Sequence, residues 1–376
     1  MVSLQRPGTG GTPWWKSVAV AAVGIFLLTR LLSLAALDLG AHHAHKSFNE
    51  ALHVFDGAYY RQIATHWYPH VLASSPHGAL APSTLAFFPL YPSLLGILRL
   101  TGLPLTAGAL LIDFLAGGAA AAVIALTVER WSSSRIGLVT AALWSAYPLA
   151  VVLSLTYSEA LFTFLAAGAL LALSRERYLA AAACVALACL TRPTGLVLVL
   201  VCLAVALKHR QLRPAGVAGA GIAAFVGWMA YLDVLTGSAT AWLTTERRGW
   251  NVYYDGGVNS ASRAAHYLLH PGQRPAATAV AVMLIALVVL LVAAWWQPMP
   301  RRYWAYAVLA FLDAVGAHNA YSSIPRFMLP AFPVLMPLAG LLQRVPRVAM
   351  WALVAVAAVA MAAAGVYIAF YSTYPP

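Results

Sequence analysis

Residues 17–37, "SVAVAAVGIFLLTRLLSLAAL", contain a single charged side chain, that of Arg30. As an α-helix, a run of this length extends about 30 Å, which is the thickness of the hydrocarbon core of a bilayer. The run is longer than the apolar region of a secretory signal peptide, and no small-residue cleavage site is evident. We therefore expect it to be a retained first membrane span.

The rest of the chain has the same character. Of its 376 residues, 62% are hydrophobic and 9% are charged, whereas charged residues make up about 25% of a soluble domain. This composition excludes a soluble globular protein and predicts an all-α polytopic membrane protein that forms one domain over residues 1–376. The net charge of +12 does not indicate nucleic-acid binding, because no soluble basic face exists to carry it.

Ten further apolar runs follow the first, so we expect about eleven spans, some of them shorter than the roughly 20 residues that a bilayer requires. Charged residues, proline and glycine separate the runs, which lie at roughly 106–128, 136–155, 159–173, 178–191, 194–207, 214–236, 276–296, 303–318, 327–342 and 347–371.

The apolar segment 86–100 is not counted as a span. Pro89 and Pro92 interrupt its first turns, and Arg99 ends it. Counting it as a span would also invert the side of the membrane on which every later loop lies. We therefore expect a re-entrant or interface-bound segment.

The distribution of basic residues predicts the orientation. With the N-terminus inside, 13 basic residues fall on the inner side and face only Glu129 and Glu176 there. The outer side and the outer half of the membrane then hold the remaining 10 basic and 9 acidic residues. We expect a cytoplasmic N-terminus and two long outer segments, at about 38–105 and 237–275.

The first long segment contains "FDGAYYRQIATHWY", residues 55–68. Tyr59, Ile63 and Trp67 recur with i, i+4, i+8 spacing, which predicts a short amphipathic helix on the membrane surface. Asp56 at its start has two interpretations. It is the N-cap of the helix, or it is a general base that faces a lipid-borne substrate.

An ionisable residue at the centre of a membrane-spanning helix costs roughly 2.5 to 3.5 kcal/mol. Each such residue is therefore expected to have a structural or functional role. Under the predicted topology, several of them fall in the outer half of their spans and could line one polar cavity that opens outward. The alternative is that the arginines extend to the interface and the acids form interhelical hydrogen bonds. These residues are Arg30, Asp113, Glu159, Arg192, Asp233 and Asp313.

Arginines at breaks in the apolar runs indicate a phosphate-bearing ligand. Arg192 in "TRPTG" and Arg326 in "HNAYSSIPRF" lie beside proline or glycine, and Arg247 with Arg248 lies in the second long segment. A guanidinium presents paired donors to phosphate oxygens, although interfacial anchoring explains the same positions. The candidate substrate-binding residues are Tyr59, Tyr60, His66, Glu159, Arg192, Arg247, Arg248, His318 and Arg326.

The histidine-rich first long segment does not predict a metal site. It holds seven histidines between His42 and His77, but no acidic residue except Glu50 has a spacing suited to share a metal with them. A solvated loop is the simpler interpretation. No cofactor is predicted; a divalent metal is compatible with the chemistry, but no motif requires one. No P-loop or dinucleotide-binding motif supports a nucleotide donor.

Several motifs together resemble a known family. "FDGAYYRQIATHWY", "AFFPLYPSLL", "TYSEALFTFLAAGALL", "TRPTGLVLV" and "SIPRFMLPAFPVL" occur in the order seen in the GPI mannosyltransferase family of the PIG-V type and its bacterial homologues. The resemblance covers roughly residues 15–345. That family belongs to the GT-C superfamily of membrane glycosyltransferases, so a GT-C-like fold is expected.

The resemblance implies an inverting mannosyltransferase that uses polyprenyl-phosphate mannose on the outer face of the bacterial inner membrane. Asp56 matches the catalytic base, with Phe55 before it where many relatives have tryptophan. Glu159, Arg192 and Arg326 match family motif positions. The acceptor would be a glycolipid, a glycan or another hydroxyl, because GPI is not expected in a bacterial protein. Besides the sugar donor and the acceptor, the expected partners are membrane lipids.

Two other classes of function remain open from the residues. Broken helices and charges inside the membrane are also typical of a transporter or flippase for a lipid-linked or anionic substrate. The absence of internal repeats, and the placement of the charges in one half of the membrane, favour the enzyme. A non-catalytic partner of an enzyme complex would show no effect of removing Asp56 beyond a change in stability.

Overall fold

The computed structural model describes residues 14–72, 81–373 and 375. The N-terminus, expected on the cytoplasmic side, and His77 of the histidine-rich segment lie outside these residues. The described part is helical apart from turns, loops and one isolated antiparallel bridge between Tyr254 and Ala317. The prediction of an all-α polytopic membrane protein is confirmed.

Five helices in the described part are long and apolar enough to cross a bilayer, judged by length and composition. They are α1 (Trp14–His43), α5 (Leu105–Glu129), α10 (Leu212–Thr236), α13 (Pro275–Ala294) and α17 (Arg347–Phe370). A helix pair, Tyr321–Phe327 and Phe332–Leu342, would make a sixth span, but it is bent by 84° at the break between its two parts.

The other helices are shorter. The short apolar helices of the described part are α4 (Leu90–Leu100), α7 (Glu159–Ser174), α8 (Tyr178–Thr191) and α9 (Gly195–His209). To these are added α6 (Ser134–Ser145), α14 (Arg301–Gly316), and α15 (Ile324–Phe327) and α16 (Met336–Leu342), which belong to the two halves of the bent pair. The two long segments add α2 (Phe48–Ala51), α3 (Asp56–His66), α11 (Ala241–Thr244), the π-turn η3 (Thr245–Gly249) and α12 (Val258–Leu269).

Each of the eleven predicted runs contains helix, but two of them are interrupted. The run 136–155 ends its α-helix at Ser145 and continues as the 3-10 turn η2 (Ala150–Ser154). The run 327–342 is broken because Pro330, Pro333 and Pro337 lack the N–H that a continuous helix requires. Helices such as α8, with 14 residues, reach only about 21 Å, so the count of eleven full spans stays a prediction.

The segment 86–100 forms α4, an 11-residue helix that packs against α3 and α5. The prediction that Pro92 interrupts this helix is wrong. Pro92 lies in the first turn, where its missing N–H has no helical partner to lose. At this length α4 is too short to cross a bilayer.

A close contact fixes α1 against α5. A Cβ atom at Gly117 would lie 2.2 Å from the tip of the Phe26 ring, so only glycine leaves room for the ring. Phe26 is fully buried and stacks on Trp144 of α6, with ring centroids 5.7 Å apart. One face of the first span is therefore held against α5 and α6.

Arg30 is a structural residue of this bundle. Its buried guanidinium donates to the carbonyl of Ser145 at 2.6 Å and to the Ser154 hydroxyl at 3.2 Å, and also to the carbonyl of Ala150. These groups lie where α6 ends and η2 begins, so Arg30 satisfies backbone acceptors that the break leaves free. The expectation that Arg30 belongs to an outward cavity is therefore wrong.

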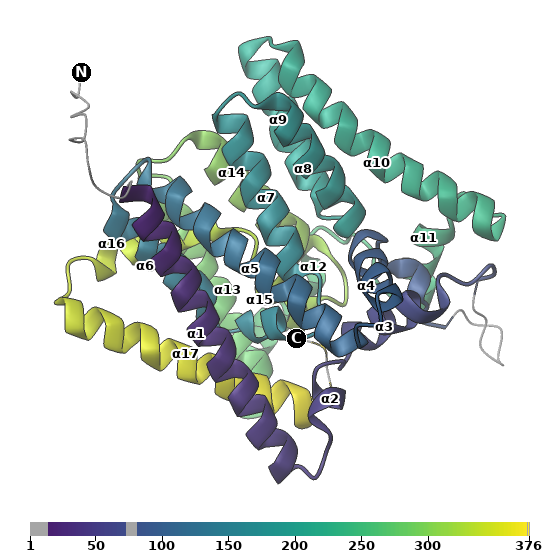
Figure 1. Cartoon of the computed structure of the whole chain (residues 1–376), viewed down its shortest axis with the longest axis horizontal. Coiled ribbons are helices and arrows are strands. Elements are labelled where there is room, and N and C mark those ends of the chain that lie inside the picture. Colours follow the sequence, from purple (N-terminus) through teal and green to yellow (C-terminus); the bar gives the residue numbers. More distant parts are fainter. Residues whose placement is uncertain (1–13, 73–80, 374, 376) are drawn as a thin grey trace.

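Hydrogen bonds join loops that are far apart in the sequence. The two long segments contact each other, since the Trp250 indole donates to the Ser83 carbonyl at 3.3 Å. Among the predicted inner loops, Arg135 donates to the carbonyl of Val345 at 3.2 Å. Figure 1 shows α3, α4 and α11 grouped on one side of the molecule, away from α6 and α16.

Candidate active site

The turn before α3 sets the position of Asp56. Phe55 has φ of 51° and ψ of −115°, a conformation that a residue with a side chain rarely adopts and that other contacts must maintain. Gly57 allows close packing there, because a Cβ would lie 3.3 Å from the carbonyl oxygen of Thr156. The turn is thus pressed against the segment that leads into α7.

Asp56 is the first residue of α3 and not its N-cap. Phe55 takes the cap position, and no side-chain hydrogen bond caps the helix. The Asp56 carboxylate instead accepts from the Arg326 guanidinium at 2.6 Å. The N-cap interpretation is therefore wrong, because the carboxylate is paired with Arg326 and caps no backbone N–H of the helix.

Four predicted residues form one chain of ion pairs. Arg326 of α15 contacts Asp56 and also lies 3.3 Å from Glu159 at the start of α7. Arg192, which ends α8, binds the same Glu159 oxygen at 2.6 Å. The chain runs Asp56, Arg326, Glu159, Arg192 and joins residues from four separate elements.

Exposure differs sharply along this chain. Glu159 is 1% exposed, Arg326 5% and Arg192 13%, whereas Asp56 is 18% exposed. Buried charges are tolerated only when they are paired, and the two acids and two arginines balance each other. Asp56 is thus the most accessible carboxylate of a charge-balanced buried group.

Aromatic rings and a hydroxyl network support the arginines. The Arg326 guanidinium lies 5.2 Å from the ring centre of Tyr157 and 5.0 Å from that of Phe327, which also faces Arg192. Tyr60 shares a 2.9 Å hydrogen bond with Ser158, which in turn accepts from Arg192 at 3.3 Å. Tyr60 is buried, so it positions this cluster and does not line an open surface.

Tyr59 faces the second long segment. Its half-buried ring stacks on Phe87 with centroids 5.0 Å apart and meets Trp250 edge to face at 4.9 Å. The prediction that Tyr59, Ile63 and Trp67 lie together on the membrane surface is wrong in detail, because Ile63 is buried inside the protein and Trp67 lies just beyond the end of the helix. The two long segments cover much of the face that was expected to lie on the membrane.

The remaining predicted site residues, which come from the second half of the sequence, lie at the edge of the cluster around Asp56. His318 donates to the Asp255 carboxylate at 2.9 Å and stacks on Tyr253, while Arg247 lies 5.7 Å from the centre of the same ring. Arg247 and Arg248 are exposed. Hydrogen bonding to His318 lowers the pKa of Asp255, which also accepts from the Gly257 and Asn259 amides of α12.

Several predicted residues do not join the cluster. His66 is exposed at the end of α3, and Asp233 is exposed near the end of α10. Asp113 is fully buried and accepts from Tyr91 at 3.3 Å. Asp313 is partly buried and near enough to Arg192 for their charges to interact. One outward cavity lined by all the intramembrane charges is therefore not observed.

Sequence reasoning missed Ser158 and Glu246. Ser158 directly precedes Glu159, and no feature of the sequence pattern marked its small polar side chain as part of the site. Glu246 precedes two arginines in "TERRG", and only the arginines were named as candidates. Burial and the charge of Asp56 raise the pKa of Glu246. This influence depends on the contact between the two long segments, which a helical or strand period cannot reveal.

Among the described histidines of the histidine-rich segment, only His53 is buried. His53 is buried and bonded to Thr106 at 2.9 Å and to Thr156 at 2.8 Å. Burial lowers the pKa of His53 to about 4, and the charge of Arg61 adds to the effect. Within the described ranges, no group of three or more histidine, cysteine, aspartate or glutamate side chains could hold a metal ion.

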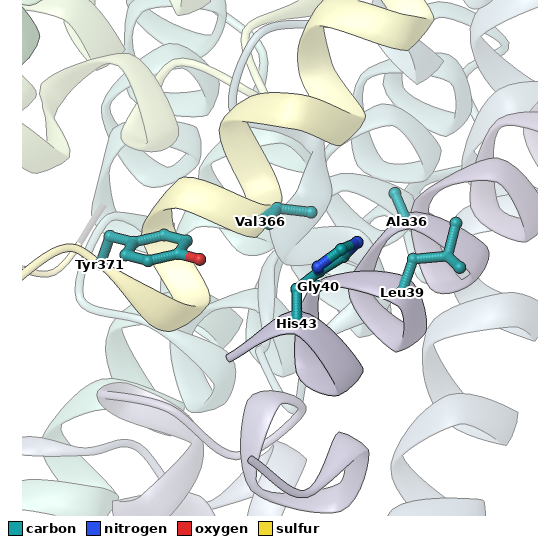
Figure 2. Close-up of a pocket in the computed structure, with 6 residues that line it drawn as sticks. All are labelled: Ala36, Leu39, Gly40, His43, Val366 and Tyr371. Carbon is teal, nitrogen blue, oxygen red and sulfur yellow. The ribbon is translucent and has the colours of Figure 1, made fainter. Parts of the chain in front are cut away.

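A groove lies apart from the ion-pair chain, between the ends of α1 and α17 (Figure 2). It has a volume of about 560 Å³ and is lined by Ala36, Leu39, Gly40, His43, Val366 and Tyr371. None of these residues belongs to the cluster around Asp56, so the groove is not part of the candidate active site.

The fold is similar to that of solved glycosyltransferase structures. ArnT from Cupriavidus metallidurans, bound to undecaprenyl phosphate, superposes with a TM-score of 0.53 and 16% identity, over 90% of this chain and 62% of that one. The apo oligosaccharyltransferase of Archaeoglobus fulgidus gives 0.53 and 14%, over 96% and 57%.

The archaeal enzyme AglB, in complex with an inhibitory peptide and a dolichol-phosphate, gives 0.52 and 14%, over 97% of this chain and 57% of that one. ArnT and AglB are GT-C superfamily glycosyltransferases, so the expected GT-C-like fold is confirmed. This chain spans about three fifths of their length. No protein-family model and no curated protein sequence matches the chain.

Proposed function

We propose that this protein is a glycosyltransferase that takes a sugar from a polyprenyl-phosphate donor, with Asp56 as its general base. The observation that carries the proposal is the position of Asp56. It is the most accessible carboxylate of an otherwise buried, charge-balanced group, at the contact of the two long segments. A helix cap or a surface acid would need no such surroundings.

In the proposed reaction, the Asp56 carboxylate takes the proton of an acceptor hydroxyl as its oxygen attacks the anomeric carbon of the sugar. The bond between that carbon and the lipid-phosphate oxygen breaks in the same step, and the electron pair stays on the phosphate. The step inverts the anomeric centre, so a β-linked donor gives an α-linked product. Arg326 holds Asp56 in place through the 2.6 Å contact.

The lipid phosphate develops negative charge as it leaves, and cations must face it. Arg192 and Arg326 are already paired with Glu159 and Asp56. Arg247 and Arg248 are exposed and lie on the turn that precedes Trp250, the partner of Tyr59. We therefore assign the phosphate to Arg247 and Arg248, and a positioning role to Arg192 and Arg326.

Two fold neighbours support a lipid-phosphate substrate, because one was solved with undecaprenyl phosphate and another with a dolichol-phosphate. Mannose as the sugar follows from the motif resemblance alone. The positive inner loops support an active site on the outer face of the inner membrane. The acceptor in this proposal is a hydroxyl of a glycolipid or glycan.

The test is transfer of labelled mannose from polyprenyl-phosphate mannose, in membranes that contain the wild type or Asp56→Asn. The wild type should transfer sugar, and Asp56→Asn should lose at least 100-fold, because a general base supplies about 10²- to 10⁴-fold. Asp38→Asn is the matched control, since Asp38 is exposed near the start of the same segment. Size-exclusion chromatography checks that all variants are folded.

Equal transfer by the wild type and Asp56→Asn would refute Asp56 as the base. No transfer by either, together with movement of a labelled polyprenyl phosphate across proteoliposomes, would favour the transporter. Addition of EDTA to the same assay tests for a divalent metal, and loss of transfer that Mg²⁺ or Mn²⁺ restores would place one in the reaction.

A further inference from the structure

The turn that carries Asp56, residues 52–57, is fastened to Thr156 in the segment that leads into α7. The Thr156 N–H donates to the Leu52 carbonyl at 2.8 Å. The Thr156 carbonyl oxygen lies close to the other end of the turn, since a Cβ at Gly57 would be 3.3 Å from it. The backbone of Thr156 therefore contacts both ends of the turn.

His53 adds a side-chain contact from inside the turn. Its Nδ1 lies 2.8 Å from the Thr156 hydroxyl, and its Nε2 lies 2.9 Å from the Thr106 hydroxyl of α5. The Thr106 hydroxyl donates to the side-chain oxygen of Asn49, so its own oxygen is left to accept from Nε2–H. Nδ1 then accepts from the Thr156 hydroxyl, because a neutral imidazole has one donor and one acceptor. One tautomer thus satisfies all of these hydrogen bonds.

The surroundings of His53 keep the ring in this neutral form. The side chain is buried, and burial lowers its pKa to about 4, with the charge of Arg61 adding to the effect. A protonated ring would donate from both nitrogens and could no longer accept from Thr156. At neutral pH His53 is therefore a fixed bridge between the turn and Thr156.

The turn needs such contacts, because its backbone is strained. Phe55 directly precedes Asp56 and has φ of 51° and ψ of −115°. A conformation of this kind persists only where the surrounding structure maintains it. No side chain caps α3, so the contacts with Thr156 have to hold the turn at the point where the Asp56 carboxylate meets Arg326 at 2.6 Å.

We propose that His53 is a positioning residue for the general base: by holding Thr156, it fixes the turn that places the Asp56 carboxylate against Arg326. The inference rests on the proposed function, since it adds a residue to the same reaction. His53 does not contact the substrate, because both ring nitrogens are already bonded within the protein. Thr156 is a suitable anchor, since the same segment continues into Glu159, which holds Arg326 from its other side.

A simpler role for His53 is to anchor α2 to α5 through Thr106 and Asn49. The two roles use different ring nitrogens and can therefore be separated. His53→Asn places an amide near the position of Nδ1 and can still accept from Thr156, whereas His53→Gln places an amide near the position of Nε2 and can still donate to Thr106. Only His53→Asn keeps the contact that is proposed to position Asp56.

The first test compares kcat and KM of these variants in the transfer assay. His53→Gln should lower kcat by about 10- to 100-fold, because a small misplacement of a reacting group is that costly, and KM should change little. His53→Asn should retain most of kcat, and Thr156→Val should resemble His53→Gln. The control is Thr140→Val, at a buried threonine that bonds only to its own helix. Equal kcat in His53→Gln and His53→Asn would overturn the inference.

The second test does not depend on transfer. Melting temperatures of the wild type, His53→Gln, Asp56→Asn and the double variant form a double-mutant cycle. If His53 holds Asp56 against Arg326, His53→Gln should cost much less in the Asp56→Asn background, where that ion pair is already lost. In an Asp38→Asn background, at an exposed acid of α1, its cost should be unchanged.

The two tests separate the inference from the proposed function. Additive melting losses for His53→Gln and Asp56→Asn would overturn the positioning role even if the wild type transfers sugar. Coupled losses in a protein that transfers no sugar would support the contact and refute the proposed function alone. If His53→Gln does not fold, Thr156→Val takes its place in the cycle.

Discussion

Glu159 is the residue on which the ion-pair chain depends. It is almost fully buried and holds both Arg192 and Arg326, which come from elements far apart in the sequence. Removing one member of a buried ion pair leaves an uncompensated charge, which costs about 3–5 kcal/mol. Glu159 is therefore expected to act through Arg326 and Arg192 and to be needed for folding as well as for activity.

We expect Glu159→Gln to lower the melting temperature of the detergent-purified protein, by the equivalent of about 3 kcal/mol. A double variant that carries both Glu159→Gln and Arg192→Gln should recover part of this loss, because the pair Asp56 and Arg326 then remains balanced. Asp233→Asn is the control at an exposed acid. If Glu159→Gln melts like the wild type, the chain of ion pairs does not stabilise the fold.

Helix packing depends on a few close approaches. Gly117 and Gly118 are neighbours on α5, yet only Gly117 faces the ring of Phe26, whereas a Cβ at Gly118 would lie 3.7 Å from Val23. Since Phe26 is fully buried and stacked on Trp144, it has little room to move. The two glycines therefore form a matched pair for testing the contact of α1 with α5.

Gly117→Ala should destabilise the protein by about 1–3 kcal/mol through overpacking, and Gly118→Ala should be close to neutral. Thermal unfolding in one detergent compares the two variants. Phe26→Leu combined with Gly117→Ala should recover stability relative to Gly117→Ala alone, since the obstructing ring is removed. Equal melting of the two alanine variants would contradict the packing.

Local rules predicted the elements better than their interruptions. The apolar run 347–371 became α17, and "FDGAYYRQIATHWY" became α3, because hydrophobicity and period determine both. The break after Ser145 was not visible, since what stabilises it is Arg30, more than 100 residues away in the chain. Asp56 and Arg326 were both named from their motifs, but only the fold reveals that they touch.

The whole molecule has its two long segments together on one side. The predicted topology places this side outward, with Ser262 of α12 exposed there and Ser132 exposed in a predicted inner loop. We expect a cysteine at Ser262 to react with a membrane-impermeant maleimide in intact cells, and one at Ser132 to react only after permeabilisation. The three native cysteines are first replaced by alanine. The reverse labelling pattern would invert the topology.

The ion-pair chain also has a consequence for biogenesis. Asp56 and Arg326 are 270 positions apart, so a ribosome makes Arg326 long after the first two spans enter the membrane. Until then Asp56 and Glu159 have no guanidinium from α15 to neutralise them. Nascent chains that stop before α15 should therefore be recognised by membrane quality-control proteases, and the late arrival of Arg326 would mark the moment at which the protein becomes resistant to degradation.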